Sequence, residues 1–416
     1  MSRTVVVIGG GVIGAACAYY LRLRGWQVTV LEAHRFGAGC SHANCGFVCP
    51  SHVLPLASPG VLREGLLSLL RPTGPLRIAP RFDPNLWSWL WQFARRCHRS
   101  LMIHAGGAIQ PLLQSSRRLF DQLLTTESLN ADWQARGMLF VFSTPRAMAH
   151  YAHTDALLRK EFALAAKPLT SSELHTLEPA LRPGLAGAWF YDTDAHLKPD
   201  LFMRALETRL IDRGVRVVEN SPVIGFQSEK RRITAAITPD ASFSADSFVL
   251  ATGSWSSRFS KYLGVRLPIQ PGKGYSITFS RPAVCPRYPL IFEEHRVAIT
   301  PFTNSYRIGS TMEFAGYDDT LNRRRLAYLT NSAAAYLREP PNQTVLEEWY
   351  GWRPMTPDGV PVIDRSLIYP NLYVAAGHNM LGLSMAPATG KLIAELLTNT
   401  APHLDPTPYR LDRFSR

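Results

Sequence analysis

Short apolar runs recur along the chain, and the first of them organises the rest. Residues 4–8 (TVVVI) are apolar and β-branched, which predicts a buried strand. The glycine-rich segment 9–14 (GGGVIG) follows at once, and residues 15–21 continue it with a pattern typical of a helix. A second apolar run, residues 27–31 (QVTVL), ends at Glu32. Strand, glycines, helix, strand and acid in this order predict a βαβ unit for a dinucleotide.

Each glycine of this segment meets a separate requirement of such a site. Gly9 allows the tight turn, Gly11 lets a pyrophosphate approach the backbone, and Gly14 lets the helix pack closely on the strand. The diphosphate is expected at the helix N-terminus, where free N–H groups and the helix dipole favour an anion. Glu32 lies about 20 residues beyond the glycines, where a carboxylate bonds a ribose hydroxyl and disfavours a 2′-phosphate. The unit is predicted to hold the ADP part of FAD or NAD.

The remainder of the chain alternates between helical and strand-like patterns. Helical spacing of apolar residues predicts helices over residues 84–127, 155–166, 199–213, 321–337 and 390–397, with a short helix capped near Ser171. Short β-branched and aromatic runs predict strands over residues 138–142, 186–191, 214–218, 223–226, 232–237, 245–250, 276–279, 297–300, 305–309 and 372–378.

The first and last of these strands run toward glycine turns, whereas the strands between them form another group. The sequence therefore predicts an α/β fold with a discontinuous Rossmann-like domain made of residues 1–60, 180–265 and 345–416. Residues 61–179 and 266–344 are expected to form an inserted α+β substrate domain with a mixed or antiparallel sheet.

The composition is compatible with two domains and limits the classes of binding partner that are expected. The chain has 416 residues, 46% of them hydrophobic, which is enough for two cores. A formal net charge of +13 is compatible with nucleic acid, with an anionic membrane surface or with solubility alone. No nucleic-acid motif is present and the arginines are scattered, so nucleic acid is not expected. No uncharged apolar stretch reaches about 18 residues, so no transmembrane helix is predicted.

Basic residues are denser between Leu62 and Arg99, a stretch also rich in leucine and tryptophan. Residues 66–71 (LLSLLR) and 86–91 (LWSWLW) are apolar with basic flanks. One interpretation is an amphipathic patch in peripheral contact with the cytoplasmic face of the inner membrane. The other, which we favour, is a set of helices packed on the protein's own core.

Because the first strand starts at the N-terminus, no room is left for a signal peptide, and a cytoplasmic protein with reduced cysteines is expected. Cys40, Cys45 and Cys49 lie in a loop rich in glycine and proline. Their spacing is not that of a Cys-x-x-Cys pair and no second cluster follows, so no metal is predicted.

Five segments together resemble a known family. They are residues 5–32, 41–46 (SHANCG, followed by Pro50 and Pro59-Gly60), 271–276 (PGKGYS), 351–361 (GWRPMTPDGVP) and 377–384 (GHNMLGLS). The chain resembles the D-amino-acid oxidase and dehydrogenase superfamily of FAD enzymes, which includes glycine oxidase and sarcosine oxidase. Within it, the chain is most similar to the bacterial D-amino-acid dehydrogenase small subunits. The resemblance implies FAD as the cofactor and makes the Rossmann-like domain an FAD-binding domain.

The resemblance also implies which residues hold the cofactor. The residues that bind the ADP half are Gly9, Gly11, Val12, Ile13, Gly14, Glu32 and Ala33, and the backbone of Val223 contacts the adenine. Ser41, Ala43 and Asn44 lie near the flavin ring and pyrophosphate, and Ala251 and Gly253 lie near the ribityl chain. The residues near the flavin N1–C2 carbonyl are Gly377, Met380, Leu381, Gly382 and Leu383.

Arg353 matches the arginine that clamps the substrate carboxylate in this family. A guanidinium offers a planar two-point fork, and a buried carboxylate needs a charge partner. Tyr275 is expected to close the site over the substrate or bond its carboxylate; the alternative is an aromatic residue of the strand core. The implied chemistry is hydride transfer from the substrate Cα–H to flavin N5, with a neutral amine and electrons leaving to a quinone or another acceptor.

His52 lies where the sequence departs from the D-amino-acid dehydrogenase pattern. The segment 49–56 (CPSHVLPL) is more similar to dehydrogenases of cis-4-hydroxy-D-proline, so His52 is a candidate acceptor of a hydrogen bond from a polar substrate. The alternative is an ordinary loop histidine. His378, within its glycine turn, is expected to be structural.

The substrate thus stays open among D-alanine, D-proline and cis-4-hydroxy-D-proline. One alternative is a glycine- or sarcosine-type oxidase that uses oxygen. Another is a flavin-binding subunit of a multi-protein complex, which would expose a large apolar patch. A nicotinamide dehydrogenase is disfavoured because it leaves the later glycine segments without a role.

Overall fold

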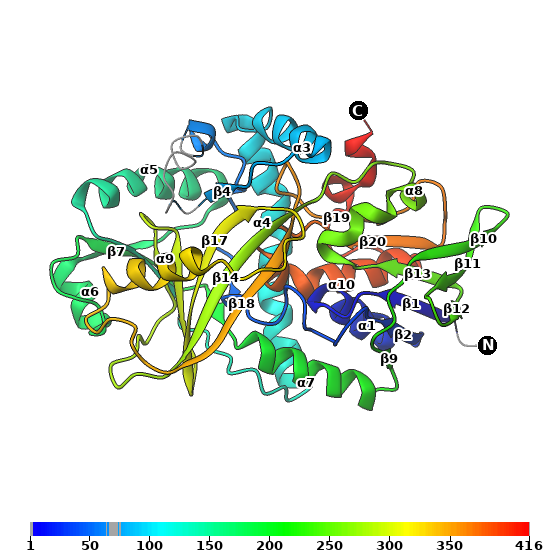
Figure 1. Cartoon of the computed structure of the whole chain (residues 1–416), viewed down its shortest axis with the longest axis horizontal. Helices are drawn as coiled ribbons and strands as arrows, with labels where there is room; N and C mark the ends of the chain where they lie inside the picture. Colours follow the sequence, from blue (N-terminus) through cyan, green and yellow to red (C-terminus); the bar gives the residue numbers. More distant parts are fainter. Residues whose placement is uncertain (1–2, 64, 66–73, 75, 416) are drawn as a thin grey trace.

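The computed structural model describes residues 3–63, 65, 74 and 76–415. Figure 1 shows two sheets side by side, with the longest helix, α4 (Arg99–Thr126), between them. The apolar stretch at residues 66–71 lies outside the described residues, so its predicted amphipathic role stays a prediction.

The N-terminal strand is the centre of a mostly parallel sheet. In the described part of the chain this sheet has the order β19 (Val362–Arg365), β20 (Leu372–Ala376), β13 (Ser247–Leu250), β1 (Thr4–Ile8), β2 (Gln27–Leu31) and β9 (Arg216–Val218). Only β19 runs antiparallel to its neighbour. One face is covered by α1 (Val12–Leu23) and α10 (Gly382–Thr398), which pack so closely that a Cβ on Gly390 would lie 2.4 Å from the Ala16 backbone. This is the predicted Rossmann-like unit, assembled from distant segments.

The second large sheet is mixed, as predicted. Among the described residues its path is β18 (Val345–Met355), β14 (Gln270–Ser280), β17 (Ser305–Phe314), β16 (Val297–Pro301), β15 (Leu290–Phe292), β5 (Met138–Phe142), β7 (Gly187–Tyr191) and β6 (Lys167–Thr170), with β4 (Leu76–Ile78) beside β17. Hydrogen bonding places β7 and β18 in this sheet, although the expected domain division assigned residues 180–265 and 345–416 to the nucleotide-binding side. A strand can start in one domain and pair in the other, which local sequence does not reveal.

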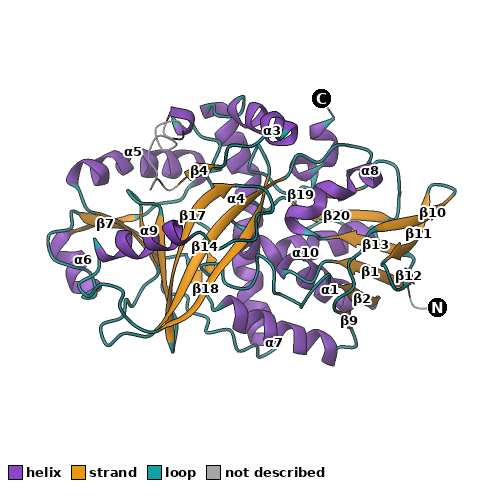
Figure 2. Ribbon diagram, viewed as in Figure 1, coloured by secondary structure: helices purple, strands orange, loops and turns teal. Residues whose placement is uncertain are grey.

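The smaller elements complete the arrangement in Figure 2. They are β3 (Phe47–Val48) with β8 (Ala195–His196); β10 (Gly225–Glu229), β11 (Arg232–Ile237) and β12 (Ser242–Ser244); α3 (Pro84–Ala94), α5 (Pro145–Phe162), α6 (Ser171–Leu177), α7 (Pro199–Asp212), α8 (Ser260–Leu263) and α9 (Arg323–Ala334); and the 3₁₀ turns η1 (Gly253–Phe259), η2 (Thr407–Tyr409) and η3 (Leu411–Phe414).

Two helix starts differ from the prediction because capping, rather than apolar spacing, sets them. α5 begins at Pro145 instead of residue 155, since the Thr144 side chain accepts from the Ala147 N–H and proline suits the first helical position. The cap of α6 is Thr170 rather than Ser171, because Thr170 and Glu173 form a reciprocal capping box.

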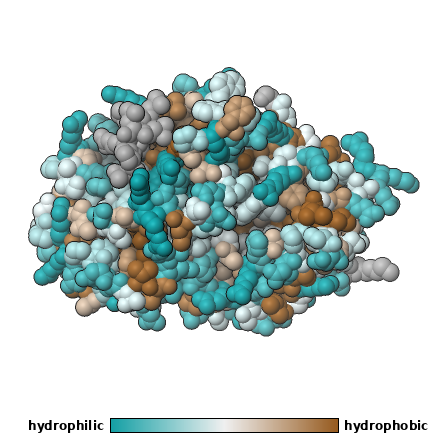
Figure 3. Space-filling model, in the orientation of Figure 1, coloured by the Kyte–Doolittle hydropathy of each residue, from teal (hydrophilic) through white to brown (hydrophobic). Residues whose placement is uncertain are grey.

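The tryptophan-rich helix α3 has two faces. Leu86, Trp89 and Phe93 are buried, which agrees with a helix packed on the protein's own core, whereas Trp87 and Trp91 are more than half exposed (58% and 59%). On the face shown in Figure 3, hydrophilic residues predominate and hydrophobic groups are scattered among them. No helix in the described ranges combines the length and apolarity needed to cross a bilayer.

Candidate active site

A single large cavity of about 2330 Å³ runs from the end of β1 to the nine-stranded sheet. Its wall combines the glycine turn after β1, the loop of residues 38–49, the N-terminal end of α10 and the strands β14 and β18. The Rossmann-like sheet and the mixed sheet therefore enclose one continuous space, as a cofactor and a substrate in contact require.

The end of the cavity at β1 has the geometry of a dinucleotide site. Gly9 has a φ of +108°, and a Cβ on Gly14 would lie only 1.8 Å from the Gly9 carbonyl oxygen. Gly11, at the N-terminus of α1, carries no side chain that would block an anion. Glu32 Oε2 accepts from the Gly10 N–H at 2.7 Å, so the carboxylate is fixed at the end of β2. These features fit the ADP part of a dinucleotide.

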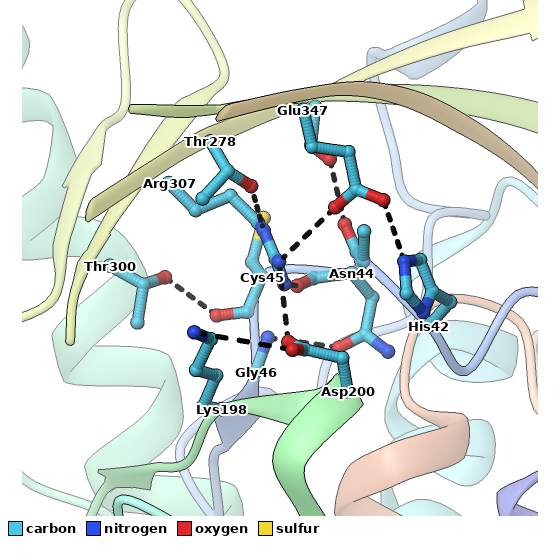
Figure 4. Close-up of polar contacts among 12 residues, drawn as sticks. His42, Asn44, Cys45, Gly46, Lys198, Asp200, Thr278, Thr300, Arg307 and Glu347 are labelled. Carbon is cyan, nitrogen blue, oxygen red and sulfur yellow. Dashed lines mark hydrogen bonds and ion pairs between the residues drawn. The ribbon is translucent and has the colours of Figure 1, made fainter. Parts of the chain in front are cut away.

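The loop of residues 41–46 is held by the mixed sheet through three successive backbone carbonyls. The Ala43 carbonyl accepts from Ser276 Oγ at 2.7 Å, that of Asn44 from Arg307 Nη1 at 2.9 Å, and that of Cys45 from Thr300 Oγ1 at 2.6 Å. The donors come from β14, β17 and β16 (Figure 4). The sheet of the substrate side therefore fixes the backbone of a loop that lines the cofactor side.

Arg307 is the centre of this arrangement. Its side chain is only 1% exposed, and Nε donates to Thr278 Oγ1 at 2.9 Å. Nη2 lies 3.5 Å from Asp200 Oδ1 and 3.8 Å from Glu347 Oε2, and Glu347 Oε1 in turn lies 2.6 Å from His42 Nε2 (Figure 4). One buried cation thus connects α7, β18 and the loop. No motif in the sequence singled out Arg307, because two of its four partners, Asp200 and Asn44, lie more than 100 residues away.

Arg353 lies on β18 at the cavity wall, and few groups of the protein offset its positive charge. Nη1 donates to the Thr311 carbonyl at 2.6 Å, and within the described ranges no carboxylate forms an ion pair with Arg353. Burial lowers the pKa of this guanidinium, and interaction with the Cys40 and Cys45 thiols partly opposes that shift. A partly buried cation without an anion is costly, so the site is prepared for an anionic group from outside the chain.

Gly274 makes room for that guanidinium. A Cβ at this position would lie 2.4 Å from Arg353 Cζ, and the glycine is on β14 opposite Gly351. Gly274 belongs to the PGKGYS motif, but no local pattern indicates that its missing side chain makes room for Arg353.

A Gly274→Ala variant is expected to displace the guanidinium without unfolding the protein, because the contacting atoms end a flexible side chain. The Michaelis constant should rise about tenfold with a smaller change in kcat, and the thermal midpoint should stay within about 2 °C of the parent. Gly107→Ala is the control, since nothing lies within 4 Å of its added Cβ. Equal Michaelis constants for the two variants would contradict the role of Gly274.

Tyr275 lies on β14 and is among the residues that line the cavity. Side chains alternate along β14, so Tyr275 points to the opposite face from Gly274, into the core with Ile277 and Phe279. Its hydroxyl donates to Glu313 Oε2 at 2.5 Å, and Tyr275 is 2% exposed. These contacts agree with the alternative interpretation, an aromatic residue of the strand core, and the predicted contact of Tyr275 with a substrate stays a prediction.

His52 lines the cavity next to a buried carboxylate. Its Nδ1 lies 3.1 Å from Ser51 Oγ, its ring centroid is 5.4 Å from that of Phe140, and burial lowers its pKa to about 4. Ser51 Oγ also donates to Asp194 Oδ2, a buried carboxylate that no motif in the sequence indicates. His378 is buried, lies 3.0 Å from Thr389 Oγ1 through Nε2, and has its pKa lowered to about 3 by burial, which agrees with a structural role.

The predicted cofactor residues converge on the same cavity, apart from two glycines that pack beside it. Those on its wall are Gly9, Gly11, Val12, Ile13, Glu32, Ala33, Ser41, Ala43, Asn44, Val223, Ala251, Gly253, Met380, Leu381, Gly382 and Leu383. Gly14 packs against Gly9, and Gly377, with a φ of +75°, packs against Thr356. Their convergence is an observation; their individual contacts with a cofactor stay predictions.

Comparison with known proteins assigns the family. Residues 4–396 match the family model described as DAO, FAD dependent oxidoreductase. The chain belongs to the DAO family of FAD-dependent oxidoreductases. A D-amino acid dehydrogenase of Bradyrhizobium diazoefficiens is 32% identical over 417 residues, with 99% of each chain covered. One from Methylobacterium nodulans is 34% identical over 408 residues, with 96% of each chain covered.

Solved structures support the fold of this DAO-family chain. Glycine oxidase from Geobacillus kaustophilus superposes with a TM-score of 0.81 at 23% identity, covering 99% of both chains. L-proline dehydrogenase from P. horikoshii gives a TM-score of 0.75 at 22% identity, covering 100% of this chain and 98% of that one. The predicted family, fold class and FAD cofactor are confirmed, and the protein is an FAD-dependent oxidoreductase.

Proposed function

We propose that this enzyme oxidises D-amino acids or cyclic imino acids, among them D-alanine, D-proline and cis-4-hydroxy-D-proline. The observation that carries the proposal is Arg353, a cation at the cavity wall without an anionic partner in the described residues. A substrate carboxylate supplies the missing charge and accepts two parallel hydrogen bonds from the fork. The names of the relatives, D-amino acid dehydrogenases, support the same substrate class.

In this proposal each group of residues has one task. FAD supplies a hydride acceptor. The glycine turn around Gly9 and Gly11, with Glu32, binds the ADP half, and the carbonyl-fixed loop of residues 41–46 keeps its backbone rigid beside the cofactor. Arg353 holds the carboxylate so that the Cα–H faces the cofactor, and the apolar cavity wall excludes water. The remaining predicted contacts of Val223, of Ala251 and Gly253, and of Gly377 and residues 380–383 belong to this proposal too.

The decisive experiment is anaerobic mixing of the FAD-loaded enzyme with single substrates. We expect D-amino acids to bleach the visible absorbance of the oxidised flavin within seconds. The L-enantiomers should leave this absorbance unchanged. The fastest of D-alanine, D-proline and cis-4-hydroxy-D-proline identifies the preferred substrate. Stable colour with every D-amino acid would refute the proposal.

The electron acceptor is proposed to be a quinone that reaches the enzyme at a membrane surface. Trp87 and Trp91 lie one helical turn apart on α3, are exposed, and border the cavity. The Arg95 guanidinium lies 4.6 Å from the Trp91 ring centroid, which combines an apolar and a cationic group as an anionic lipid surface requires. Oxygen as the acceptor, with peroxide as the product, is the competing oxidase function.

Exchange of both exposed tryptophans tests the membrane contact. A Trp87→Ser/Trp91→Ser variant is expected to bind vesicles with anionic lipid about tenfold more weakly than the parent, because two apolar rings are lost. Leu346→Ser, which removes another exposed apolar side chain (57%), is the control and should bind like the parent. Unchanged sedimentation of the double variant with vesicles, or peroxide equal to the substrate consumed, would refute this part.

A further inference from the structure

The Ser51 hydroxyl connects a buried carboxylate to the imidazole of His52. Ser51 Oγ lies 2.6 Å from Asp194 Oδ2 and 3.1 Å from His52 Nδ1, and the Ser51 N–H donates to Asp194 Oδ1 at 3.1 Å. Asp194 is completely buried, whereas Ser51 and His52 line the cavity. In the part of the chain that the structure describes, His52 Nε2 has no hydrogen-bond partner.

The number of protons shared by Asp194, Ser51 and His52 determines whether His52 Nε2 is a hydrogen-bond donor or acceptor. An ionised carboxylate has no proton, so the Ser51 proton must lie toward Asp194 and Oγ must accept from His52 Nδ1–H. A neutral imidazole with its proton on Nδ1 has a bare Nε2, which is an acceptor. If Asp194 is protonated, it donates to Ser51, Ser51 donates to Nδ1, and the imidazole proton moves to Nε2.

We propose that Asp194, acting through Ser51, sets the tautomer of His52, and that the bare Nε2 of His52 accepts a hydrogen bond from the N–H of the substrate amine. His52 is then a substrate-binding residue, and Ser51 and Asp194 are positioning residues. The inference rests on the proposed oxidation of amino acids, because an amine N–H is the donor that an acceptor at this place would select.

Burial shifts the pKa values of both outer groups, the Asp194 carboxyl group and the His52 imidazole, in the directions that this proposal requires. Burial raises the pKa of Asp194 to about 7 and lowers that of His52 to about 4. The imidazole is therefore neutral above about pH 4; it is a donor at Nε2 between about pH 4 and 7 and an acceptor above about pH 7. The titratable and charged groups around Asp194 are Cys49, Asp192 and Arg117. Tyr151, Glu293 and Arg296 line the same cavity as His52.

A metal site is a weaker interpretation of the same residues. Ligand atoms of Cys49, His52 and Asp194 lie within 4.8 Å of one another. However, both Asp194 oxygens already accept from Ser51, and burial raises the pKa of the Cys49 thiol well above its usual range, which disfavours the thiolate that a metal binds.

Nitrogen NMR of the FAD-loaded enzyme labelled with ¹⁵N-histidine tests the tautomer without any substrate. The spectrum of His52→Gln identifies the His52 signals by their absence. We expect the bare-nitrogen signal to move from Nδ1 to Nε2 between pH 6 and 8, with a midpoint near the pKa of Asp194, about 7. In Asp194→Asn the amide donates to Ser51, so Nε2 should carry the proton throughout. A tautomer independent of pH in the parent, or a bare Nε2 in Asp194→Asn, would overturn the inference.

Activity measurements test the consequence. Asp194→Asn and Ser51→Ala are expected to lower kcat/KM at pH 8 about 10–100-fold, mainly through the Michaelis constant, and to lose the fall in kcat/KM below about pH 7. Ser116→Ala is the matched control: this buried hydroxyl accepts from the Ala388 N–H away from His52, and its loss should leave the pH profile unchanged. Parent-like pH profiles in both positioning variants would overturn the role. If the tautomers are as expected but the enzyme oxidises no D-amino acid, the proposed function is refuted. The inference that Asp194 sets the tautomer of His52 is then still supported.

Discussion

Replacement of Arg353 by methionine is expected to lower kcat/KM for D-amino acids about 10³-fold while the protein stays folded and retains FAD. The loss corresponds to about 4 kcal/mol, which is typical when one partner of a buried, charged hydrogen-bonded pair is removed. Arg353→Lys should recover only part of the activity, because an ammonium group cannot make two parallel bonds to a carboxylate.

The same substitution should raise the thermal midpoint of the substrate-free enzyme. Methionine removes a cation whose guanidinium has no anionic partner in the described residues and whose pKa is lowered by burial. In the parent, a simple carboxylate such as propionate should raise the midpoint, and in Arg353→Met it should not. Thermal scans with and without propionate measure both effects. Activity within fivefold of the parent, or a propionate effect that persists in the variant, would exclude Arg353 as the carboxylate clamp.

Replacement of Arg307 by methionine is expected to have the largest effect on stability, about 3–5 kcal/mol, with weaker retention of FAD. It leaves the Asp200 and Glu347 carboxylates without their shared cation and the Asn44 carbonyl without its donor. Because that carbonyl belongs to a loop that lines the cavity and is predicted to contact the cofactor, FAD should dissociate at a lower temperature. The rise of flavin fluorescence on heating measures the release.

Two further variants separate this effect from a general loss of charge. Arg323→Met removes an arginine that is 72% exposed and pairs with Glu348, so it should change stability by less than about 0.5 kcal/mol. Adding Glu347→Gln to Arg307→Met should restore part of the stability, since one unpaired carboxylate becomes neutral. Release of FAD from Arg307→Met at the temperature found for Arg323→Met would contradict the role of the network.

Features that depend on neighbours in sequence could be predicted from the sequence. The strand, the glycine turn around Gly9, the helix and Glu32 occupy about 30 consecutive residues, and each step follows from local conformational preference. Part of the mixed sheet was predictable for the same reason, since short turns join β15 to β16 and β16 to β17. The family resemblance then identified Arg353, whose short motif carries the signal, but it also suggested Tyr275, whose side chain the strand alternation directs into the core.

Relations between distant segments were decided by the tertiary structure alone. Arg307 meets Asn44 across 263 residues and Glu347 on another strand of the mixed sheet, and no local pattern connects Arg307 with either partner. Asp194 reaches Ser51 across 143 residues, and only burial of that pair gives the carboxyl group a pKa near 7. The sequence by itself determined the dinucleotide unit, the family and the cofactor, because short-range geometry specifies them. The tertiary structure determined the state of each charge, because desolvation and pairing depend on what the whole fold places around it.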